Sequence, residues 1–275
     1  MTRPEPKPPG ADKRHGPLRR GVYLLPSLFT IGNMLLGFYA IVCAFRGYVS
    51  GVDGEVAGGL FRRAAVLVFS AGILDGLDGR IARMVGIESD FGREYDSLAD
   101  AVTFGMTPAL LCYFWGLHAF GRVGWLVPLF YLICCVTRLA RFNVQTQVLD
   151  HRDFVGLPTP AAAGAVCALL FFAPDIDWKP YAAGTLLAAL TLVGVLMVST
   201  FRFRSFKNID LKQRRSYRTL VPVAAVVLVT ALHPPAFFLA VAVLYTLSGP
   251  LAWAWGRLRP KRTEERTEEP AETAP

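Results

Sequence analysis

Long apolar runs alternate along this sequence with short charged or Pro-rich segments. A helix needs about 20 apolar residues to cross the ~30 Å hydrocarbon core of a bilayer, and most of the runs are close to that length. The runs lie near residues 24–45, 64–84, 97–117, 124–144, 158–174, 181–200, 220–233 and 236–256. The seventh run is the shortest. The pattern predicts an all-α protein, a polytopic membrane helical bundle with about eight transmembrane helices.

The polar segments at the two ends divide the chain further. Residues 1–21 are basic and Pro-rich, and residues 258–275 are charged and contain Pro. Segments of this composition cannot bury enough apolar surface to fold. We therefore expect a disordered cytoplasmic arm at 1–21, a membrane domain at 22–218, an additional transmembrane hairpin at 219–257 and a disordered cytoplasmic tail at 258–275.

Composition and charge support the membrane interpretation. The chain is 53% hydrophobic and 18% charged, whereas soluble proteins carry about 25% charged residues. A net charge of +8 would suggest a nucleic-acid partner for a soluble protein, but most of the 29 Lys and Arg residues fall on one side of the alternating spans. The exceptions are Arg46, Arg62, Arg63, Arg122 and Lys179. The positive-inside rule then places both termini in the cytoplasm of an integral protein of the cell membrane, with no nucleic-acid partner.

Four aspartates lie in or at the ends of the second and third runs. Asp75 and Asp78 are three residues apart and Asp96 and Asp100 are four apart, so each pair projects from one helix face. The short connection makes the two helices antiparallel neighbours, so the four carboxylates converge. An aspartate at mid-bilayer costs about 2.5 to 3.5 kcal/mol unless it is compensated, and divalent cations with oxygen ligands are the natural counterions. The pattern predicts a two-metal diphosphate site near the cytoplasmic face.

Small residues interleave with these acids. Gly76, Gly79 and Gly92 occupy helical positions where glycine costs about 1 kcal/mol relative to alanine, which suggests that a ligand approaches the backbone closely. Gly79 and Ala82 leave a wall without long side chains, suited to a flat base or a sugar. Arg83, one turn beyond Gly79, is positioned to pair with a phosphate. Ordinary helix caps or snorkelling groups would explain one of the acids but not four at this spacing.

Residues 75–100 carry a resemblance to a known family. They read DGLDGRIARMVGIESDFGREYDSLAD, which fits D-x-x-D-G-x-x-A-R, eight residues, and G-x-x-x-D-x-x-x-D at every fixed position. This resembles the signature of the CDP-alcohol phosphatidyltransferases. Within that family the chain is most similar to the integral-membrane members that use serine as acceptor. The similar stretches are LPSLFTIGNMLLGF (25–38), SDFGREYDSLADAVTFGMTPALL (89–111), RLARFN (138–143), GLPTPAAAG (156–164) and, more weakly, RFRSFK (202–207).

The resemblance implies a six-helix catalytic core and a specific reaction. The phosphatidyl group of CDP-diacylglycerol would pass to the hydroxyl of L-serine, giving phosphatidylserine and CMP. The implied metal ligands, for two ions of Mg²⁺ or Mn²⁺, are Asp75, Asp78, Asp96 and Asp100, and Asp100 would also be the general base. The implied cytidine and diphosphate site consists of Asp75, Gly76, Asp78, Gly79, Ala82, Arg83 and Gly92. The family also implies a homodimer that contacts membrane lipids.

The residues that recognise the acceptor are less well defined by the sequence. Arg138 and Arg141 lie three apart at the end of the fourth run with Asn143 close behind, so they either face the serine carboxylate or anchor the topology. Arg204 and Lys207 raise the same question, and attraction to anionic lipid headgroups is favoured there.

Two other functions remain open on the sequence. A sister enzyme would use the same donor with inositol or glycerol 3-phosphate as acceptor. A cation-coupled transporter would also carry acids within its spans. The transporter is disfavoured, because the sequence shows no internal repeat and the four aspartates lie in one hairpin rather than in two related sites.

Overall fold

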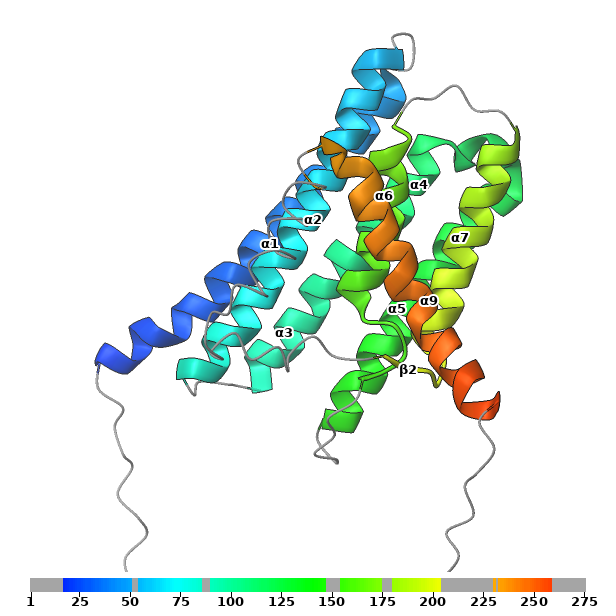
Figure 1. Cartoon of the computed structure of the whole chain (residues 1–275). Coiled ribbons are helices and arrows are strands. Elements are labelled where there is room, and N and C mark those ends of the chain that lie inside the picture. The colour runs from blue at the N-terminus through cyan, green and yellow to red at the C-terminus, as the bar shows by residue number, and fades with distance from the viewer. Residues whose placement is uncertain are drawn as a thin grey trace, which may run out of the picture.

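Figure 1 presents a computed structural model of the chain, which is a bundle of helices. The structure describes residues 17–50, 54–85, 90–146, 154–174, 180–203, 230 and 232–258. The α-helices are α1 (Pro17–Val49), α2 (Gly54–Val85), α3 (Asp90–Asp100), α4 (Thr107–Trp115), α5 (Gly121–Thr146), α6 (Thr159–Phe172), α7 (Pro180–Val198) and α9 (Pro234–Leu258). A π-helix, η1 (Ala101–Met106), and a 3₁₀-helix, η2 (Leu117–Phe120), join them. Strands β1 (Phe154–Val155) and β2 (Arg202–Phe203) form one short antiparallel pair.

The helical bundle has the dimensions of a membrane protein. Among the described residues, five helical segments are long and apolar enough to span a bilayer. They are Leu28–Val49, Glu55–Arg80, Phe91–Trp115, Leu117–Val144 and Pro234–Trp255. Helices α6 and α7 contain shorter apolar segments, Thr159–Phe172 and Gly184–Val198. The predicted all-α membrane architecture is confirmed, while the count of eight spans stays a prediction, because most of the run at 220–233 lies outside the described residues, together with residues 1–16 and 259–275.

The helices extend beyond the apolar runs that predicted them. Helix α1 begins at Pro17, inside the arm expected at 1–21, and proline is well tolerated in the first turn of a helix. Helix α2 begins at Gly54 and continues through Arg62 and Arg63, which are both exposed. Hydropathy locates the segment that contacts hydrocarbon, whereas the backbone hydrogen-bond ladder continues into the polar flank. The predicted boundaries were therefore too narrow at both helices.

Helices α1 and α2 lie side by side over much of their length (Figure 1). Both helices bury small residues, including the fully buried Ala40 and Ala44 on α1 and Ala64 on α2. At Gly47 the two helices come close together, since a Cβ atom there would lie 3.2 Å from the ring of Phe61. Small residues let membrane helices approach closely and gain van der Waals contact. This pair forms the wall against which α3, α4 and η1 pack.

The third apolar run, 97–117, was expected to form one continuous helix, but the structure divides it into three elements. Helix α3 ends at Asp100, η1 follows directly, and α4 completes the span. The buried Tyr131 hydroxyl on α5 donates to the Phe104 carbonyl over 3.0 Å, and Thr107 Oγ1 donates to the Val102 carbonyl over 3.0 Å. Side-chain donors therefore satisfy carbonyls of the widened turn. Single π-turns often occur next to functional residues, and this one begins at the residue after Asp100.

Candidate active site

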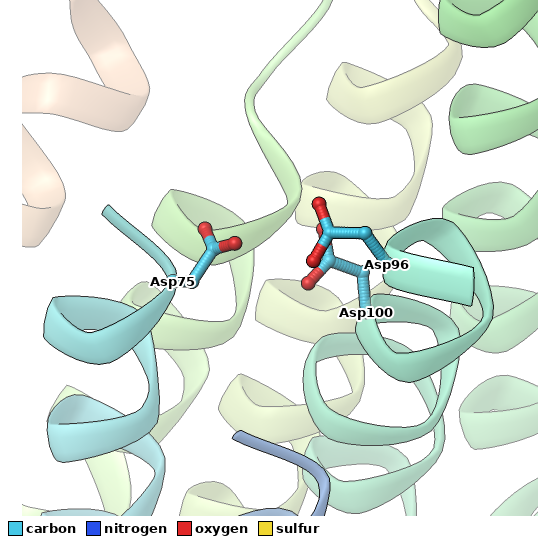
Figure 2. Close-up of side chains that lie close together, drawn as sticks. All are labelled: Asp75, Asp96 and Asp100. Atoms are coloured by element: carbon cyan, nitrogen blue, oxygen red, sulfur yellow. The ribbon is translucent and has the colours of Figure 1, made fainter. Parts of the chain in front are cut away.

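Three of the predicted aspartates meet in one place. Asp75 lies on α2, and Asp96 and Asp100 lie one turn apart on α3. Figure 2 shows Asp75 facing the other two carboxylates across the gap between the helices. One oxygen from each of the three carboxylates lies within 4.8 Å of the other two. Three negative groups this close repel one another unless a cation binds between them, and oxygen donors at this spacing suit Mg²⁺ or Mn²⁺.

Asp78 is held differently from the other three. It is 6% exposed, and its Oδ2 accepts a 2.8 Å hydrogen bond from the Thr30 hydroxyl of α1. Its Oδ1 is buried without a hydrogen-bond partner. It follows Asp75 by three residues on α2, so it lies near the cluster, but it does not belong to the group of three. The orphaned Oδ1 is an oxygen that a cation can satisfy.

Asp100 is also held by α1. It is 9% exposed, and its Oδ1 accepts a hydrogen bond of 3.3 Å from the Asn33 side-chain amide. Asn33 is itself 1% exposed, and its backbone carbonyl accepts a hydrogen bond from Thr103 of η1 over 3.3 Å. Thr30 and Asn33 thus each donate to one aspartate from the same helix face. Sequence reasoning missed both, although they are polar residues three apart in the apolar stretch 25–38.

The carboxylates line a cavity of about 650 Å³ between α2, α3, α5 and the start of α6. This volume is large enough for a nucleotide headgroup or a comparable small molecule. Its lining combines acids, two arginines, glycines and apolar side chains. The lining residues are Gly72, Ile73, Asp75, Gly76, Leu77, Gly79, Arg80, Asp96, Asp100, Arg138, Leu139, Phe142, Pro158, Thr159 and Pro160.

The three predicted acceptor residues take different positions. Arg138 lines the cavity, is 7% exposed and donates from a terminal guanidinium nitrogen to Thr159 Oγ1 over 3.3 Å. Its Nε has no hydrogen-bond partner. Arg141 instead donates to the Val198 carbonyl at the end of α7 over 3.4 Å. Asn143 joins α5 to α3 through Ser97, with Nδ2 donating to the Ser97 hydroxyl over 2.9 Å. Of the three, only Arg138 is part of the cavity wall.

A sequence profile of the CDP-alcohol phosphatidyltransferase family matches residues 23–200, which contain every cavity-lining residue. The chain belongs to this family. The resemblance inferred from residues 75–100 is thereby confirmed, and the match covers α1 through α7 apart from the first turns of α1. Helix α9 lies beyond it.

Relatives within the family are similar over most of the chain. A protein from Helicobacter pylori named CDP-diacylglycerol–serine O-phosphatidyltransferase is 37% identical over 237 residues, covering 84% of this chain and 92% of the relative. A protein of the same name from Mycobacterium tuberculosis is 34% identical over 242 residues, covering 85% of this chain and 80% of the relative. A third, from Bacillus subtilis, is 34% identical over 186 residues, covering 67% of this chain and 92% of the relative.

The small residues of the CDP-alcohol phosphatidyltransferase motif are only partly described. Gly76 and Gly79 line the cavity, and a Cβ atom at Gly76 would meet no atom within 4 Å. Packing within the protein therefore does not require glycine at 76, and its absent side chain enlarges the cavity. The side chains of Ala82 and Arg83 lie outside the described part of the structure. Gly92 lies on α3 and is not among the described residues that line the cavity.

The cavity also contains polar residues that the sequence reasoning did not select. Arg80 follows the motif glycine at 79, and Thr159 begins α6. Thr159 belongs to the stretch GLPTPAAAG, which carried part of the family resemblance, so its position was marked although its contact with Arg138 was not. A single polar residue between two prolines at the start of an apolar helix is the signal that could have identified it.

Proposed function

We propose that this chain is a CDP-diacylglycerol–serine O-phosphatidyltransferase, which transfers the phosphatidyl group of CDP-diacylglycerol to L-serine and releases CMP. The observation that carries the proposal is the cluster of Asp75, Asp96 and Asp100 in one cavity with the buried Arg138. The family match and the names of the relatives from three bacteria support it.

The donor binds at the end of the cavity formed by α2 and α3. Asp75, Asp78, Asp96 and Asp100 hold two divalent ions, Mg²⁺ or Mn²⁺. Bound metal neutralises the diphosphate and the CMP leaving group. The cytidine and the diphosphate lie against Asp75, Gly76, Asp78, Gly79, Ala82, Arg83 and Gly92. The 4.8 Å grouping of carboxylate oxygens and the open space at Gly76 support this assignment.

The acceptor reacts next to Asp100. The serine oxygen forms a bond to the phosphorus attached to diacylglycerol, the bond from that phosphorus to the CMP oxygen breaks, and the serine hydroxyl proton passes to the Asp100 carboxylate. The serine hydroxyl is a very weak acid, so it attacks phosphorus slowly unless a base within reach accepts its proton. The hydrogen bond from Asn33 to Oδ1 fixes the orientation of the Asp100 carboxylate at the wall of the cavity.

Arg138 binds the serine carboxylate. Arg138 lines the same cavity as Asp100 and has an unpartnered Nε, so a carboxylate bound there lies near the proposed base. Arginine forms directional, charge-assisted hydrogen bonds with carboxylates. Arg141 and Asn143 support the acceptor end indirectly, because their hydrogen bonds connect α5 to α7 and α3.

The enzyme works within the cytoplasmic membrane as an eight-span protein with both termini in the cytoplasm. A six-helix catalytic core at 22–218 is followed by a further hairpin at 219–257, and polar segments at 1–21 and 258–275 extend into the cytoplasm. The active site opens near the cytoplasmic face, where serine is available. The chain acts as a homodimer surrounded by membrane lipids. The excess of basic residues on one side of the alternating spans supports this orientation.

Release of CMP from CDP-diacylglycerol tests the acceptor. Membranes containing the protein are incubated with the donor, Mn²⁺ or Mg²⁺, and serine, inositol or glycerol 3-phosphate in turn. Serine should release CMP and the other two alcohols should not. Release with inositol or glycerol 3-phosphate and none with serine would refute the acceptor while leaving the family intact.

The variant Asp100→Asn tests the base. We expect CMP release to fall by about 10² to 10⁴-fold, because general-base catalysis typically contributes that factor. The amide keeps the shape of the side chain, so the protein should still fold and be extracted in the same yield as Glu55→Gln, a substitution at an exposed site on α2. Turnover retained in Asp100→Asn would contradict the assignment.

A further inference from the structure

Helix α9 lies beyond the part of the chain that matches the family profile, yet it packs against the strand that follows α7 (Figure 1). The contact is made by Phe203 of β2, which is 1% exposed. A Cβ atom at Gly249 of α9 would lie 2.5, 2.6 and 2.9 Å from three carbons of the Phe203 ring. The glycine therefore allows the ring to lie directly on the α9 backbone.

A second residue of α9 also contacts the Phe203 ring. Tyr245, one turn before Gly249, has its ring centroid 5.9 Å from that of Phe203. Further along the helix, Trp253 makes an edge contact with Phe201 at 5.6 Å between centroids. Aromatic pairs at these distances are favourable beyond the area they bury. Helix α9 thus contacts both β2, at Phe203, and the residue before it, Phe201.

Strand β2 in turn pairs with the segment that leads to the acceptor end of the cavity. Residues 154–159, which we call the strap, begin with β1, and Phe154 pairs with Phe203 in the antiparallel register. The Gly156 amide donates to the Phe201 carbonyl over 2.8 Å. Gly156 has φ of +83°, and a Cβ atom there would lie 2.3 Å from the Met197 carbonyl oxygen, so the strap requires glycine at this turn.

The strap ends at the cavity. Pro158 and Thr159 both line it, and Thr159 accepts the hydrogen bond from Arg138. Thr159 is 2% exposed and is both the last residue of the strap and the first residue of α6, so the strap and the helix together set its position. A continuous series of contacts therefore runs from α9 through Phe203 and the strap to the guanidinium of Arg138.

We propose that α9 is a positioning element for acceptor binding: Gly249 and Tyr245 hold Phe203, and through the strap they fix the Thr159 hydroxyl that orients Arg138. This inference rests on the proposed function, because it assigns Arg138 to the acceptor. The series contains no residue of α2 or α3, which build the donor end. Within the described residues, the one aromatic contact of α9 with α2, Phe238 on Phe69, lies near the start of α9, away from Tyr245 and Gly249.

Steady-state kinetics of Gly249→Ala tests the proposal. The added methyl group displaces the Phe203 ring, so we expect the KM for serine to rise by about tenfold, the effect of losing one good hydrogen bond. The kcat and the KM for CDP-diacylglycerol should stay unchanged, since weaker ground-state binding of one substrate alters only its own KM. The matched control is Gly184→Ala on α7, where a Cβ atom would meet nothing within 4 Å.

A compensating variant separates positioning from loss of folding. Combining Gly249→Ala with Phe203→Leu makes room for the new methyl group and should restore a low KM for serine. Tyr245→Phe keeps the ring contact with Phe203 and should leave the KM for serine close to that of the unmodified enzyme. The proposal is overturned if Gly249→Ala lowers kcat and raises both KM values to a similar extent, or if it changes none of the three. It is also overturned if the double variant does not restore the KM for serine.

Failure of the proposed function is distinguishable from failure of this inference. If the unmodified enzyme releases CMP only with another alcohol, the acceptor assignment fails, and the same variants are then measured with that alcohol. A selective change in the KM of that alcohol supports α9 as a positioning element. If the KM of that alcohol does not change selectively, the role of α9 is refuted independently of the identity of the acceptor.

Discussion

Thr30 and Asn33 contact two catalytic-motif aspartates from α1, a helix that contains no acidic residue. Their role resembles that of outer-shell groups in metal sites, which orient the ligands and are nearly as important as the ligands themselves. The Thr30 hydroxyl is bound to a carboxylate oxygen of Asp78, so it fixes the direction in which the other oxygen points.

Replacing Thr30 with valine removes this hydrogen bond and keeps the volume of the side chain. We expect CMP release at limiting Mn²⁺ to fall by about 10- to 100-fold, as for other outer-shell substitutions. Excess Mn²⁺ or the variant Thr30→Ser should restore much of the activity. The measurement is a Mn²⁺ titration, with Thr191→Val on α7 as control, because the Thr191 hydroxyl bonds only its own helix at an exposed site. An unchanged Mn²⁺ dependence would show that Thr30 does not orient a metal ligand.

The two candidate acceptor arginines are predicted to differ in their effect on serine. Arg138→Gln should raise the KM for serine by about 10- to 100-fold, the usual range for a lost hydrogen bond to a charged group. Arg141→Gln should have a smaller effect, because Arg141 contacts the Val198 carbonyl and does not line the cavity. Kinetics with serine varied at saturating donor distinguish the two. Equal effects of the two substitutions would remove the distinction drawn from the structure.

At the residue scale, the sequence predicted which aspartates form the site and the family of the protein, but not the residues that hydrogen-bond to those aspartates. The spacing of Asp75, Asp96 and Asp100 was sufficient to predict their convergence, because helical periodicity fixes which face they share. It could not predict that Asp78 is bound by Thr30, since three residues correspond to a rotation of about 300° and a neighbouring helix decides which side is occupied. Arg138 and Arg141 differ for the same reason.

Among the elements, α1 and η1 approach each other closely at Gly37. A Cβ atom at this position would lie 2.8 Å from the Thr103 Oγ1 and 3.0 Å from the Thr103 Cα. The neighbour is therefore partly backbone and cannot move aside. Sequence analysis treated residues 97–117 as one helix, because a π-helix has no distinct hydrophobic period, and its presence depends on side-chain donors from α5 such as Tyr131.

The variant Gly37→Ala should destabilise the protein. Overpacking a close contact typically costs about 1 to 3 kcal/mol, and here it would also shift Thr103, which bonds the Asn33 carbonyl. Thermal unfolding in detergent measures the loss against Gly59→Ala on α2, where a Cβ atom would meet nothing within 4 Å. Equal stability of the two variants would show that α1 and η1 can separate without cost.

The molecule as a whole presents an apolar exterior, with large hydrophobic side chains such as Leu35, Phe38 and Leu244 more than half exposed. Such a surface is stable only in contact with lipid. All five cysteines are free and buried, so none of them is accessible to polar thiol reagents. This property allows the orientation of the chain to be tested with little background.

Single cysteines introduced at Thr2 and Thr273 should react with a membrane-impermeant maleimide only from the cytoplasmic side. We expect labelling in inverted vesicles and none in intact cells, because the excess of basic residues predicts that both ends lie in the cytoplasm. The unsubstituted protein is the control. Labelling of the two positions from opposite sides would require an odd number of spans.

The four motif aspartates come from one hairpin, α2 and α3, whereas Arg138 and Thr159 come from α5 and from the segment before α6. Under the proposed function, nucleotide handling and alcohol selection are therefore encoded in separate stretches of the gene. Substitutions in the later stretch would then change which alcohol is used without disturbing the hairpin proposed to bind the ions. A lineage carrying this architecture can diversify its phospholipid headgroups while inheriting a single activated lipid precursor, and chimeric enzymes that exchange only the later stretch are the natural way to reproduce that history.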